Sequence, residues 1–431
     1  MLEDKTFAHL GVSPALVDAL AEGGVHRPFP IQIETLPDTL AGRDVLGRGK
    51  TGSGKTLAFS IPLVSRLDAG GRRPGKPTGL VLAPTRELAT QIAATIAPLA
   101  AVRGLRVVTI FGGVSQHKQV AALKSGVDIV VACPGRLDDL MKQGVVSLGA
   151  VQVTVIDEAD HLADLGFLPT VTRILAATPA GGQRLLFSAT LDAAVDTLVK
   201  RFLSNPVTRS IAEPKSVAPA MTHHFFCVDG PQAKKELVHR LAAGDSRRIL
   251  FMRTKHQARK LARQLTQSGI ASVELHGNLS QNVRDRNLAA FAAGDARVLV
   301  ATDIAARGVH VDNIELVVHV DPPPEHKAYL HRSGRTARAG ASGDVVTIVL
   351  PEQRRDTESM MRKAAIRAVP QQVTAASPVI QTLAGQASAG QVTAPVSVPP
   401  QRPGPAPVAS RGPAAARGRR RRSRRPAAAS R

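Results

Sequence analysis

The chain has 431 residues, of which 43% are hydrophobic, and its formal net charge is +22. Two cysteines cannot form a disulfide framework, no stretch approaches the roughly 18 apolar residues of a membrane span, and the opening residues lack a long apolar run. These features argue against a disulfide-rich secreted protein and a membrane protein. We therefore expect a cytoplasmic location, and a polyanionic partner such as nucleic acid.

Short β-branched runs alternate with longer helical patterns over residues 1 to about 365. Runs such as 128–132 and 153–157 are apolar on both faces, which is typical of a parallel sheet covered by helices. A stretch at 211–220 has two prolines and no periodicity, and the alternation then resumes. We predict an α/β fold with a first domain at 1–210, a linker at 211–220 and a second domain at 221–365.

The composition changes near residue 368. From Ala368 onward there are ten arginines, no lysine and no acid, so the first 367 residues keep a net charge of +12 (22 less 10). Such a segment buries too little apolar surface to offset chain entropy, and we predict a disordered Pro/Ala/Arg-rich tail over 366–431. The tail has two open interpretations: an extension that binds RNA phosphates, or a device for solubility or ribosome proximity.

The stretch "GKTGSGKT", residues 49–56, has the spacing of a phosphate loop and follows the apolar pair Val45-Leu46. Glycines allow backbone N–H groups to surround phosphate oxygens, and the helix that begins near Lys55 adds its positive dipole end. The lysine supplies a charge for the phosphates, and the Thr56 hydroxyl suits Mg²⁺. The predicted nucleotide-binding residues here are Thr51, Gly52, Ser53, Gly54, Lys55 and Thr56.

The stretch "VTVIDEADHL", residues 153–162, places three acids in four positions after a buried strand. An acid at such a strand end is the expected second half of a nucleotide site. We predict that Asp157 holds Mg²⁺, mostly through water, and that Glu158 orients or deprotonates the attacking water. The metal would offset the local negative charge. The role of Asp160 does not follow from this reasoning.

"DEAD" at 157–160, preceded by the phosphate loop and followed by "SAT" at 188–190, resembles the DEAD-box ATP-dependent RNA helicase family, bacterial type. The resemblance covers about residues 5–350, with the motifs in the family's order and spacing. It implies two tandem RecA-like domains with parallel sheets flanked by helices and ATP bound between them. The activity it implies is local unwinding or remodelling of RNA duplexes and RNA–protein complexes, coupled to ATP hydrolysis.

The resemblance extends to residues that would contact the nucleotide. "GVHRPFPIQ" at 24–32 is similar to the family's adenine-reading segment, which implies a bidentate contact of Gln32 with adenine. Phe7 would pack on the base, although a core anchor is an equally open interpretation. Asp303, in "ATDIAARG" at 301–308, would join the network around the nucleotide.

RNA-backbone contacts are also implied, mostly without sequence specificity. They fall in "PTRELA" (84–89), Gly112-Gly113, "CPGR" (133–136) and the start of "ATDIAARG". The corresponding residues are Pro84, Thr85, Arg86, Gly113, Gly135, Arg136 and Thr302. Ribosomal and RNA-degradation partners are considered as well, whereas no membrane partner is expected.

Coupling residues and arginine fingers complete the resemblance. Asp160 would bond to Ser188 or Thr190 and so link the nucleotide state to the grip on RNA. In "YLHRSGRTAR" at 329–338, His331 is implied in coupling, and Arg335 and Arg338 resemble arginine fingers. Such a finger can be worth roughly 10³–10⁵ in rate.

Three departures and two alternatives stay open. Cys133 stands where the family usually has Thr, His310 where it usually has Asp, and Ala337 where it usually has Gly. The first could weaken an RNA contact and the second puts ribose recognition in doubt. The alternative functions are a DNA-directed ATPase motor, and an RNA clamp or annealing factor that acts mainly through the basic tail.

Overall fold

The computed structural model describes residues 5–49, 52–210, 221–306, 311, 313–337 and 342–385. The predicted linker at 211–220 and the chain from residue 386 onward lie outside the described residues. Two α/β domains are present, one before the linker and one after it, and each is built on a fully parallel sheet. Within the described residues, no helix is both long enough and apolar enough to span a bilayer.

In the first domain, the described residues form a seven-stranded sheet in the order β3-β4-β2-β5-β6-β1-β7. Its strands are β1 Val45–Arg48, β2 Gly79–Leu82, β3 Val107–Ile110, β4 Ile129–Ala132, β5 Val153–Ile156, β6 Gln183–Ser188 and β7 Val207–Ser210. Its helices are η1 Ala8–Leu10, α1 Pro14–Glu22, α2 Pro30–Leu40, α3 Lys55–Arg66, α4 Arg86–Val102, α5 His117–Ser125, α6 Pro134–Lys142, α7 Ala159–Asp164, α8 Leu168–Ala176 and α9 Ala193–Phe202.

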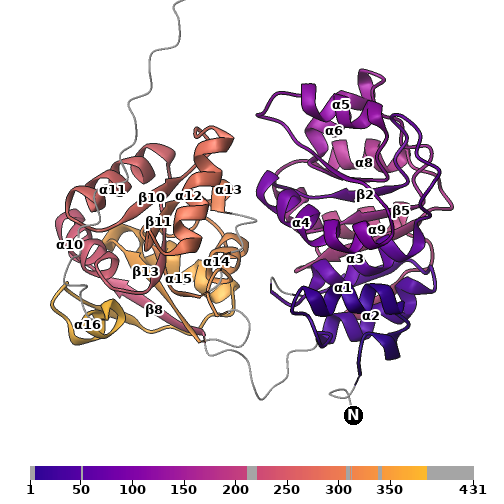
Figure 1. Ribbon diagram of the computed structural model, residues 1–431. Coiled ribbons are helices and arrows are strands. Elements are labelled where there is room, and N and C mark those ends of the chain that lie inside the picture. Colours follow the sequence, from indigo (N-terminus) through magenta and orange to yellow (C-terminus); the bar gives the residue numbers. More distant parts are fainter. Residues whose placement is uncertain are drawn as a thin grey trace, which may run out of the picture. The chain divides into compact units, whose positions relative to one another are not determined.

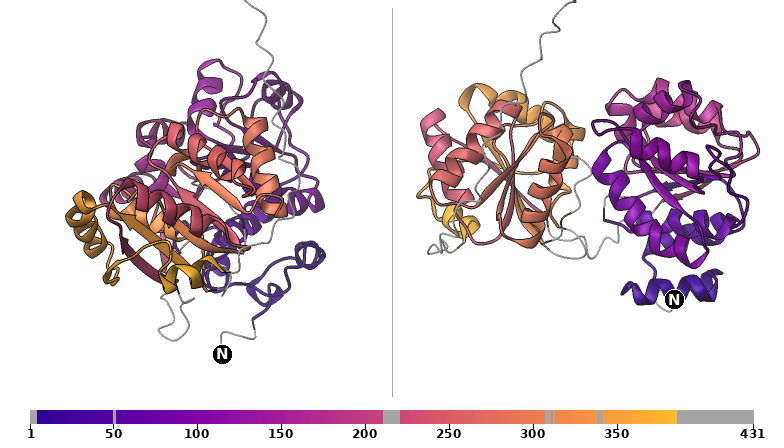
Figure 2. Two further views of the ribbon diagram at one scale, coloured as in Figure 1. Left: turned by 90° about the vertical axis from the view of Figure 1, so that its left-hand side faces the viewer. Right: turned by 45° about the horizontal axis from the view of Figure 1, so that its top comes forward.

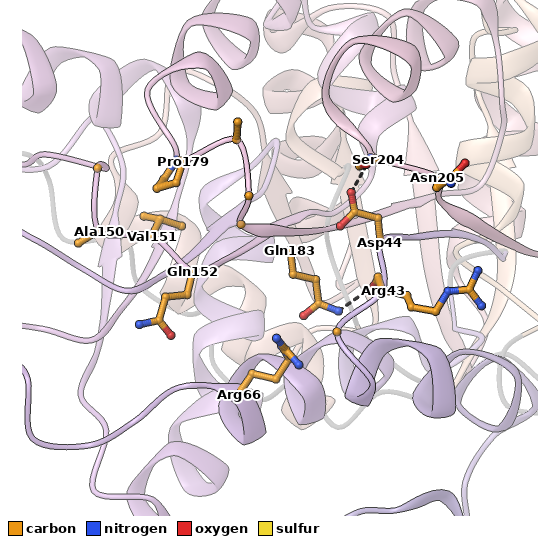
Figure 3. Close-up of a pocket in the computed structure, with 15 residues that line it drawn as sticks. Arg43, Asp44, Arg66, Ala150, Val151, Gln152, Pro179, Gln183, Ser204 and Asn205 are labelled. Carbon is orange, nitrogen blue, oxygen red and sulfur yellow. Dashed lines mark hydrogen bonds between the residues drawn. The ribbon is translucent and has the colours of Figure 1, made fainter.

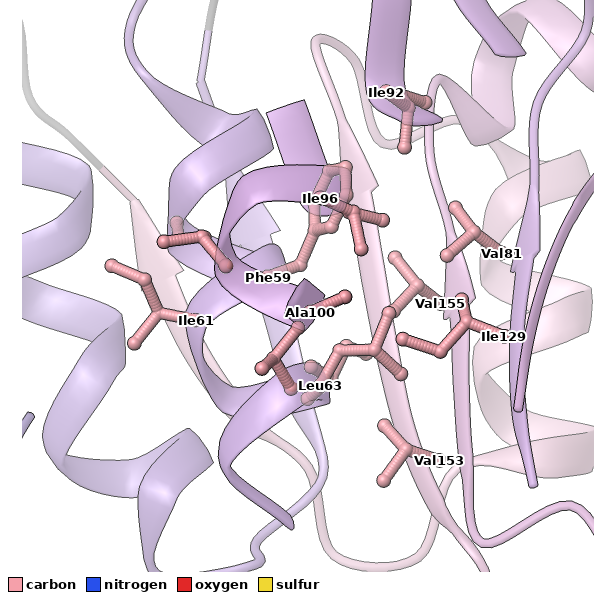
Figure 4. Close-up of a cluster of buried hydrophobic side chains, with 14 of the residues drawn as sticks. Phe59, Ile61, Leu63, Val81, Ile92, Ile96, Ala100, Ile129, Val153 and Val155 are labelled. Atoms are coloured by element: carbon pink, nitrogen blue, oxygen red, sulfur yellow. The ribbon is translucent and has the colours of Figure 1, made fainter. Parts of the chain in front are cut away.

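The central strands of this sheet are buried on both faces because helices cover each side (Figure 1). Successive residues of a strand point to opposite faces, so the core divides into two clusters. Leu80 belongs to one cluster and Val81 to the other. Figure 4 shows the face on which Val81 lies, where side chains of the sheet meet those of α3 and α4, including Phe59 and Ile96.

In the second domain, the described residues form another seven-stranded sheet, in the order β10-β11-β9-β12-β13-β8-β14. Helices again flank both of its faces (Figure 2). Its strands are β8 Met221–Cys227, β9 Arg247–Phe251, β10 Ser272–Leu275, β11 Val298–Ala301, β12 Ile314–His319, β13 Gly343–Val349 and β14 Pro370–Gln372. Its helices are α10 Pro231–Ala242, α11 Lys255–Gln267, α12 Gln281–Ala293, α13 Asp303–Ala306, α14 His326–Ser333, η2 Pro351–Gln353, α15 Arg354–Lys363 and α16 Pro378–Ala384.

The predicted start of the tail at residue 366 is wrong. Strand β14 adds to the sheet beside β8, with Pro370 paired to Phe225, and α16 packs against α10. The side chains of Ile380 and Ala384 are fully buried. The second domain therefore continues to residue 385, because a short edge strand and a short helix cover apolar surface that a domain ending at 365 would leave in water.

Candidate functional site

The phosphate loop leaves the carboxyl end of β1 and enters α3. Gly54, the residue before α3, has φ +88°, a left-handed conformation that glycine adopts without steric cost. A Cβ atom at Gly54 would lie 2.6 Å from Nε2 of Gln32 and 2.8 Å from Cδ2 of Phe29. Only glycine therefore fits, and the loop can turn its backbone toward a ligand. Thr51, also predicted to bind nucleotide, lies outside the described residues.

Lys55 extends back into this loop. Its side chain is buried, and Nζ donates a hydrogen bond to the Gly49 carbonyl oxygen at 2.5 Å. The hydroxyl of Ser53 is also buried, and among the described residues it has no hydrogen-bond partner. A buried donor without an acceptor is costly and usually has a functional reason. A cation and an unsatisfied hydroxyl in one loop fit the oxygens of a phosphate group.

Asp157 follows β5 directly and lies at the edge of the sheet where β1 also ends, since β6 alone separates the two strands. Its carboxyl group is buried. Burial is the main cause that raises its pKa, the Lys55 charge opposes the rise, and the negative charges of Glu158 and Asp160 add to it. A carboxyl group held in such surroundings favours a nearby cation.

The residues at this edge fit Mg²⁺, which prefers hard oxygen ligands. The Asp157 carboxylate and the Thr56 hydroxyl, at the start of α3, are the two oxygen donors that would hold it, and the charges of Glu158 and Asp160 lie close to Asp157. No group of three or more His, Cys, Asp or Glu side chains surrounds a metal position within the described chain. The protein would thus supply few ligands, as is usual where Mg²⁺ binds together with phosphates.

Glu158 is the residue before α7 and has φ +49° and ψ +53°, a conformation uncommon outside glycine. Its carboxylate Oε2 lies 3.0 Å from Nδ1 of His161, one helical turn further on. Burial tends to raise the pKa of Glu158, but the hydrogen bond from His161, together with the charges of His161, Arg335 and Lys55, holds it well below its usual range. Glu158 therefore stays ionised.

Asp160 makes the contacts that were expected of it. Its Oδ2 accepts hydrogen bonds from the Thr190 backbone N–H at 2.9 Å and from the Thr190 hydroxyl at 2.8 Å. Its own backbone N–H donates to the Ser188 hydroxyl at 3.2 Å. Because Ser188 ends β6, these bonds tie the acidic turn after β5 to the neighbouring strand end.

Arg335 of the second domain lines a small cavity together with the catalytic candidates of the first. The full lining consists of Lys55, Glu158, Asp160, His161, Ala189, His331 and Arg335. Arg335 is 4% exposed, and its charge contributes to lowering the pKa of Glu158. The predicted finger thus lies beside the predicted base. Arg338, the second predicted finger, lies outside the described residues.

The other half of the same sheet edge carries the loops predicted to contact RNA. Strand β4 ends directly before "CPGR", and strands β2 and β3 end one residue before "PTRELA" and Gly112-Gly113. The Thr85 hydroxyl accepts a hydrogen bond from the Leu88 N–H and so caps α4. The guanidinium of Arg86 lies against Gly113, where a Cβ atom would overlap it. Loops that carry backbone amides and arginines therefore lie at the same edge of the first sheet as the phosphate loop, on the other half of that edge.

Comparison with known proteins agrees with this geometry. The sequence profile of the "DEAD/DEAH box helicase" family matches residues 29–198, and that of the "Helicase conserved C-terminal domain" matches residues 232–340. The two profiles together match more than half of the chain. The chain belongs to the DEAD-box helicase family.

Curated relatives of this helicase-family chain include DEAD-box ATP-dependent RNA helicase 9, mitochondrial, of Arabidopsis thaliana, which is 37% identical over 373 residues. That alignment covers 84% of this chain and 60% of the relative. ATP-dependent RNA helicase DeaD of Escherichia coli K12 is 40% identical over 334 residues, and that alignment covers 77% of this chain and 53% of the relative. The chain thus spans between half and two thirds of the length of these relatives.

Among solved structures, Saccharomyces cerevisiae Dbp5 bound to RNA and ADP BeF3 superposes on this helicase-family chain with a TM-score of 0.76. The two sequences are 25% identical, and the match covers 88% of this chain and 100% of the yeast chain. A DEAD box protein from Methanococcus jannaschii gives a TM-score of 0.51 at 29% identity, covering 86% of this chain and 99% of the archaeal one. The predicted fold of two tandem RecA-like domains is confirmed.

Three residues predicted to contact the nucleotide, namely Phe7, Gln32 and Asp303, make other contacts in this DEAD-box chain. Phe7 is 2% exposed and belongs to the core, so the core-anchor interpretation holds and Phe7 offers no surface to a base. The aromatic ring next to the phosphate loop is Phe29, which is 48% exposed. The sequence signal for it was present in "GVHRPFPIQ", but only tertiary packing shows which of the two aromatic rings is accessible.

The amide of Gln32 is buried and takes part in two internal hydrogen bonds. Its Nε2 donates to the Gly54 carbonyl oxygen at 2.9 Å, and its Oε1 accepts from the Phe29 N–H at 2.9 Å. A bidentate contact with adenine therefore requires these bonds to rearrange. Asp303 is likewise engaged, by Arg332 Nε at 2.5 Å and Nη2 at 2.8 Å, and it is not among the residues that line the cavity.

The remaining predicted RNA residues follow strand ends as expected. Arg136 lies in the first turn of α6 and donates to the Val114 carbonyl oxygen at 3.4 Å, which brings the loops after β3 and β4 together. Thr302 follows β11 in the second sheet. Burial raises the pKa of the nearby Cys133 thiol to about 12, so this departure from the family's usual Thr introduces no reactive thiolate.

A wider pocket lies at the opposite edge of the first sheet, where the strands begin (Figure 3). The Gln183 amide donates to the carbonyl oxygens of Thr39 and Arg43, and the Asp44 carboxylate accepts from the backbone N–H groups of Arg184 and Ser204. These bonds join loops to one another. Ligands of open α/β sheets bind at the carboxyl ends of strands, and none of the predicted site residues lines this pocket.

Proposed function

We propose that this chain is an ATP-dependent RNA helicase that locally unwinds or remodels RNA duplexes and RNA–protein complexes, coupled to ATP hydrolysis. One observation carries the proposal: a buried lysine of a phosphate loop, an ionised glutamate and an arginine of the other domain line one cavity. The names of the relatives and the RNA-bound state of yeast Dbp5 support RNA as the substrate.

Each residue of the site has a task in this proposal. Lys55 and the backbone of the phosphate loop bind the β- and γ-phosphates. Bound Mg²⁺, held by Asp157 and Thr56, would neutralise charge on the phosphates. Glu158 orients the attacking water and accepts its proton. Arg335, with Arg338 as the second predicted finger, stabilises the charge that develops on the transferred phosphoryl group. Phe29 offers its exposed ring to the base, and Asp303 would act through its contact with Arg332.

The coupling of hydrolysis to RNA would pass through the sheet edge. Asp160 and Thr190 join the catalytic turn to the end of β6, and the RNA-contacting loops lie on the other half of that edge. A change at the phosphate site therefore reaches the RNA loops through hydrogen bonds between neighbouring strand ends. His331, which lines the cavity, would report the same change to the second domain.

The energetics favour local rather than long-range unwinding. Switching a two-state protein almost completely takes roughly 5.5 kcal/mol, whereas stacking is worth about 1.4 kcal/mol per base-pair step, with DNA as the guide. One closure of the domains therefore separates only a handful of base pairs. The contacts run mainly to the RNA backbone, so we expect little sequence specificity.

The test compares ATP hydrolysis with RNA and DNA oligonucleotides of one sequence. We expect RNA to stimulate hydrolysis, and we expect Glu158→Gln to abolish hydrolysis while leaving ATP and RNA binding intact. Stronger stimulation by DNA would establish the alternative of a DNA-directed motor. Displacement of a short labelled strand, but not of a long duplex, is the matching unwinding result.

The second candidate function is an RNA clamp or annealing factor that acts mainly through its ten C-terminal arginines. A chain ending at residue 385 keeps both sheets and removes those arginines. If that chain loses all RNA-dependent activity while Glu158→Gln keeps it, the clamp is established. Ten phosphate contacts would lower log K by at most about 7 per unit of log[salt] on a single strand, so the salt dependence of RNA binding measures the tail's share.

Location and partners belong to the same proposal. The two cysteines, both free, suit a reducing compartment, and we propose the cytoplasm, with the ribosome or the RNA-degradation machinery as partners of the basic tail. Cell fractionation and crosslinking to bound RNA with the Glu158→Gln chain test both points. Recovery of the chain mainly with membranes, or without RNA, would contradict them.

A further inference from the structure

His161 is a polar residue of the cavity to which the proposed reaction assigns no task. It lies in α7, three positions after Glu158, and its side chain is 4% exposed. Because α7 begins at Ala159, positions 158 and 161 lie on the same side of the first turn. The ring therefore reaches the carboxylate, with Nδ1 at 3.0 Å from Oε2 of Glu158.

The chemistry of the pair defines the proton on the ring. A carboxylate oxygen accepts hydrogen bonds, so in this 3.0 Å contact Nδ1 of His161 is the donor. The other oxygen of the carboxylate, Oε1, is then the one left to face a reactant. A charge-assisted hydrogen bond of this kind restricts the rotation of a carboxylate.

Glu158 also has an unusual backbone. Its φ of +49° is one of few positive values at non-glycine residues in the described chain. Such conformations persist only where the surroundings hold them, and they gather at functional sites. The backbone N–H of Glu158 donates to Asp157 Oδ1 at 2.9 Å, and its carbonyl accepts from the Leu162 N–H at 3.0 Å. The main chain is thus fixed, and the side chain is fixed separately by His161.

The second nitrogen of the ring supplies an independent observation. Nε2 of His161 is buried, and no donor or acceptor reaches it within the described chain. The ring lies against the cavity lined by Lys55 and Arg335 and within 6.2 Å of the His331 ring, centroid to centroid. One nitrogen of the ring is thus bound to the proposed base, and His161 lines the same cavity as Lys55 and Arg335.

We propose that His161 is a positioning residue for Glu158, and that its Nδ1–H holds the carboxylate with Oε1 toward the attacking water. This inference rests on the proposed ATPase function. His161 touches Glu158 rather than the phosphates, so it acts on the rate of hydrolysis and not on the affinity for ATP.

Three variants of His161 separate the effect of its N–H donor from the effect of its ring. His161→Phe keeps a planar ring of similar size and removes the donor. His161→Asn places an amide N–H near the position of Nδ1, whereas His161→Gln places it near the position of Nε2. The measurements are single-turnover ATP hydrolysis with saturating RNA, KM for ATP, and binding of a fluorescent ADP analogue.

We expect His161→Phe to lower kcat by about 10- to 100-fold, the loss typical of a charge-assisted hydrogen bond, with KM for ATP and ADP-analogue binding within about twofold of the parent. His161→Asn should recover most of the rate and His161→Gln should not.

A parent-like kcat in His161→Phe would overturn the proposal, and so would an equal loss in the Asn and Phe variants when both bind the ADP analogue normally. If His161→Phe does not fold, the comparison of Asn with Gln carries the same decision. Failure of the proposed function is a separate result: the unmodified chain would then show no RNA-stimulated hydrolysis. Hydrolysis that Glu158→Gln abolishes, together with an indifferent His161, would leave the ATPase standing and refute the positioning role alone.

Discussion

Asp160 Oδ2 accepts two hydrogen bonds from Thr190, one from the backbone N–H at 2.9 Å and one from the hydroxyl at 2.8 Å. Asp160 is 2% exposed, so these donors rather than water provide the hydrogen bonds to Oδ2. The first bond belongs to the main chain, so a substitution at position 190 by any residue other than proline retains its donor. The second bond belongs to the side chain, so a substitution that removes the hydroxyl measures how much this bond contributes to coupling.

Thr190→Val keeps the shape of the side chain and removes that hydroxyl. A hydrogen bond to a charged group is worth about 1.5–3 kcal/mol, so we expect duplex unwinding to fall at least tenfold, with ATP binding nearly unchanged. Strand displacement and RNA-stimulated ATP hydrolysis, measured side by side, check this. Thr190→Ser retains the donor and serves as the control. Equal unwinding by the two variants would show that the hydroxyl has no part in coupling.

The pKa of Asp157 predicts a pH-dependent requirement for Mg²⁺. Burial, the main cause, raises the pKa of this carboxyl group, and a proton on it competes with the cation. The Mg²⁺ concentration for half-maximal ATP hydrolysis should therefore fall as the pH rises through the raised pKa, and level off once Asp157 is ionised. In Asp157→Asn the requirement should be much higher and should not vary with pH. A requirement in the unmodified chain that does not vary with pH would contradict Asp157 as a ligand.

Arg284 and Glu87 form a buried ion pair between α12 and the first turn of α4, with Nε and Oε1 2.8 Å apart. Gln281 also donates to Glu87 Oε1, at 3.2 Å. Removing one partner of such a pair leaves an uncompensated buried charge, which typically costs about 3–5 kcal/mol. We expect Arg284→Met and Glu87→Gln each to reduce RNA-stimulated ATP hydrolysis, with a coupling free energy of about 1–3 kcal/mol in the double variant.

The control for this pair lies on the same helix. Arg286 is exposed, and Arg286→Met should leave RNA-stimulated hydrolysis close to that of the parent chain. Strict additivity of Arg284→Met and Glu87→Gln would mean that the pair does not contribute to the active arrangement. Glu87 directly follows Arg86 in sequence. A measured coupling would therefore connect the first-domain loop that is predicted to contact RNA to α12 of the second domain.

His223 predicts how the second domain responds to acid. Burial and, secondarily, the charge of His224 lower the pKa of His223 to about 4, and its Nδ1 lies 2.8 Å from the Tyr329 hydroxyl. The unfolded chain takes up this proton near pH 6.5. The free energy of unfolding should therefore fall between about pH 6.5 and pH 4, by less than about 1.4 kcal/mol per pH unit because the ring is partly exposed, and be independent of this group outside that window.

His223→Gln removes the titrating group and retains a side chain that can bond to Tyr329. Chemical denaturation of both chains at several pH values should show a shallower slope for the variant between pH 6.5 and 4. His319, whose pKa burial holds well below its usual value, is present in both chains, so the difference reports His223. Identical slopes would show that another group is responsible.

Local rules explain why the predicted Lys55 and Asp157 reach the same edge of the sheet. A glycine-rich loop after one strand and an acid after another reach the same sheet edge whenever the sheet is parallel, so Lys55 and Asp157 could be assigned from spacing. The sequence does not single out His161, because a spacing of three from Glu158 also occurs on solvated helix faces, and only the structure shows the ring buried against the carboxylate. The accessible ring of Phe29 and the buried one of Phe7 differ only through tertiary packing.

The end of the second domain likewise cannot be predicted from local sequence. Residues 366–385 are rich in Ala, Gln and Pro and carry no strong periodicity, so composition predicts a tail. Strand β14 has three residues and α16 has seven, lengths at which neither element is stable alone. They exist because β8 offers a free edge and α10 an apolar face, and both of these lie more than 120 residues earlier in the chain.

A chain ending at residue 365 should therefore be less stable than one ending at 385. The shorter chain loses the buried side chains of Val373 and Ile380, which contribute about 1.5–3 kcal/mol each. It also deprives Arg248, whose side chain is buried, of a bond to the Ala384 carbonyl oxygen at 2.8 Å. We expect the melting temperature of the second domain to be several degrees lower in the chain that ends at residue 365, but not in the chain that ends at residue 385. Ile380→Ser in the 385 chain is the matched point change and should give part of that shift. If both truncated chains melt together with the full-length protein, β14 and α16 do not stabilise the domain, and the boundary drawn from composition was adequate.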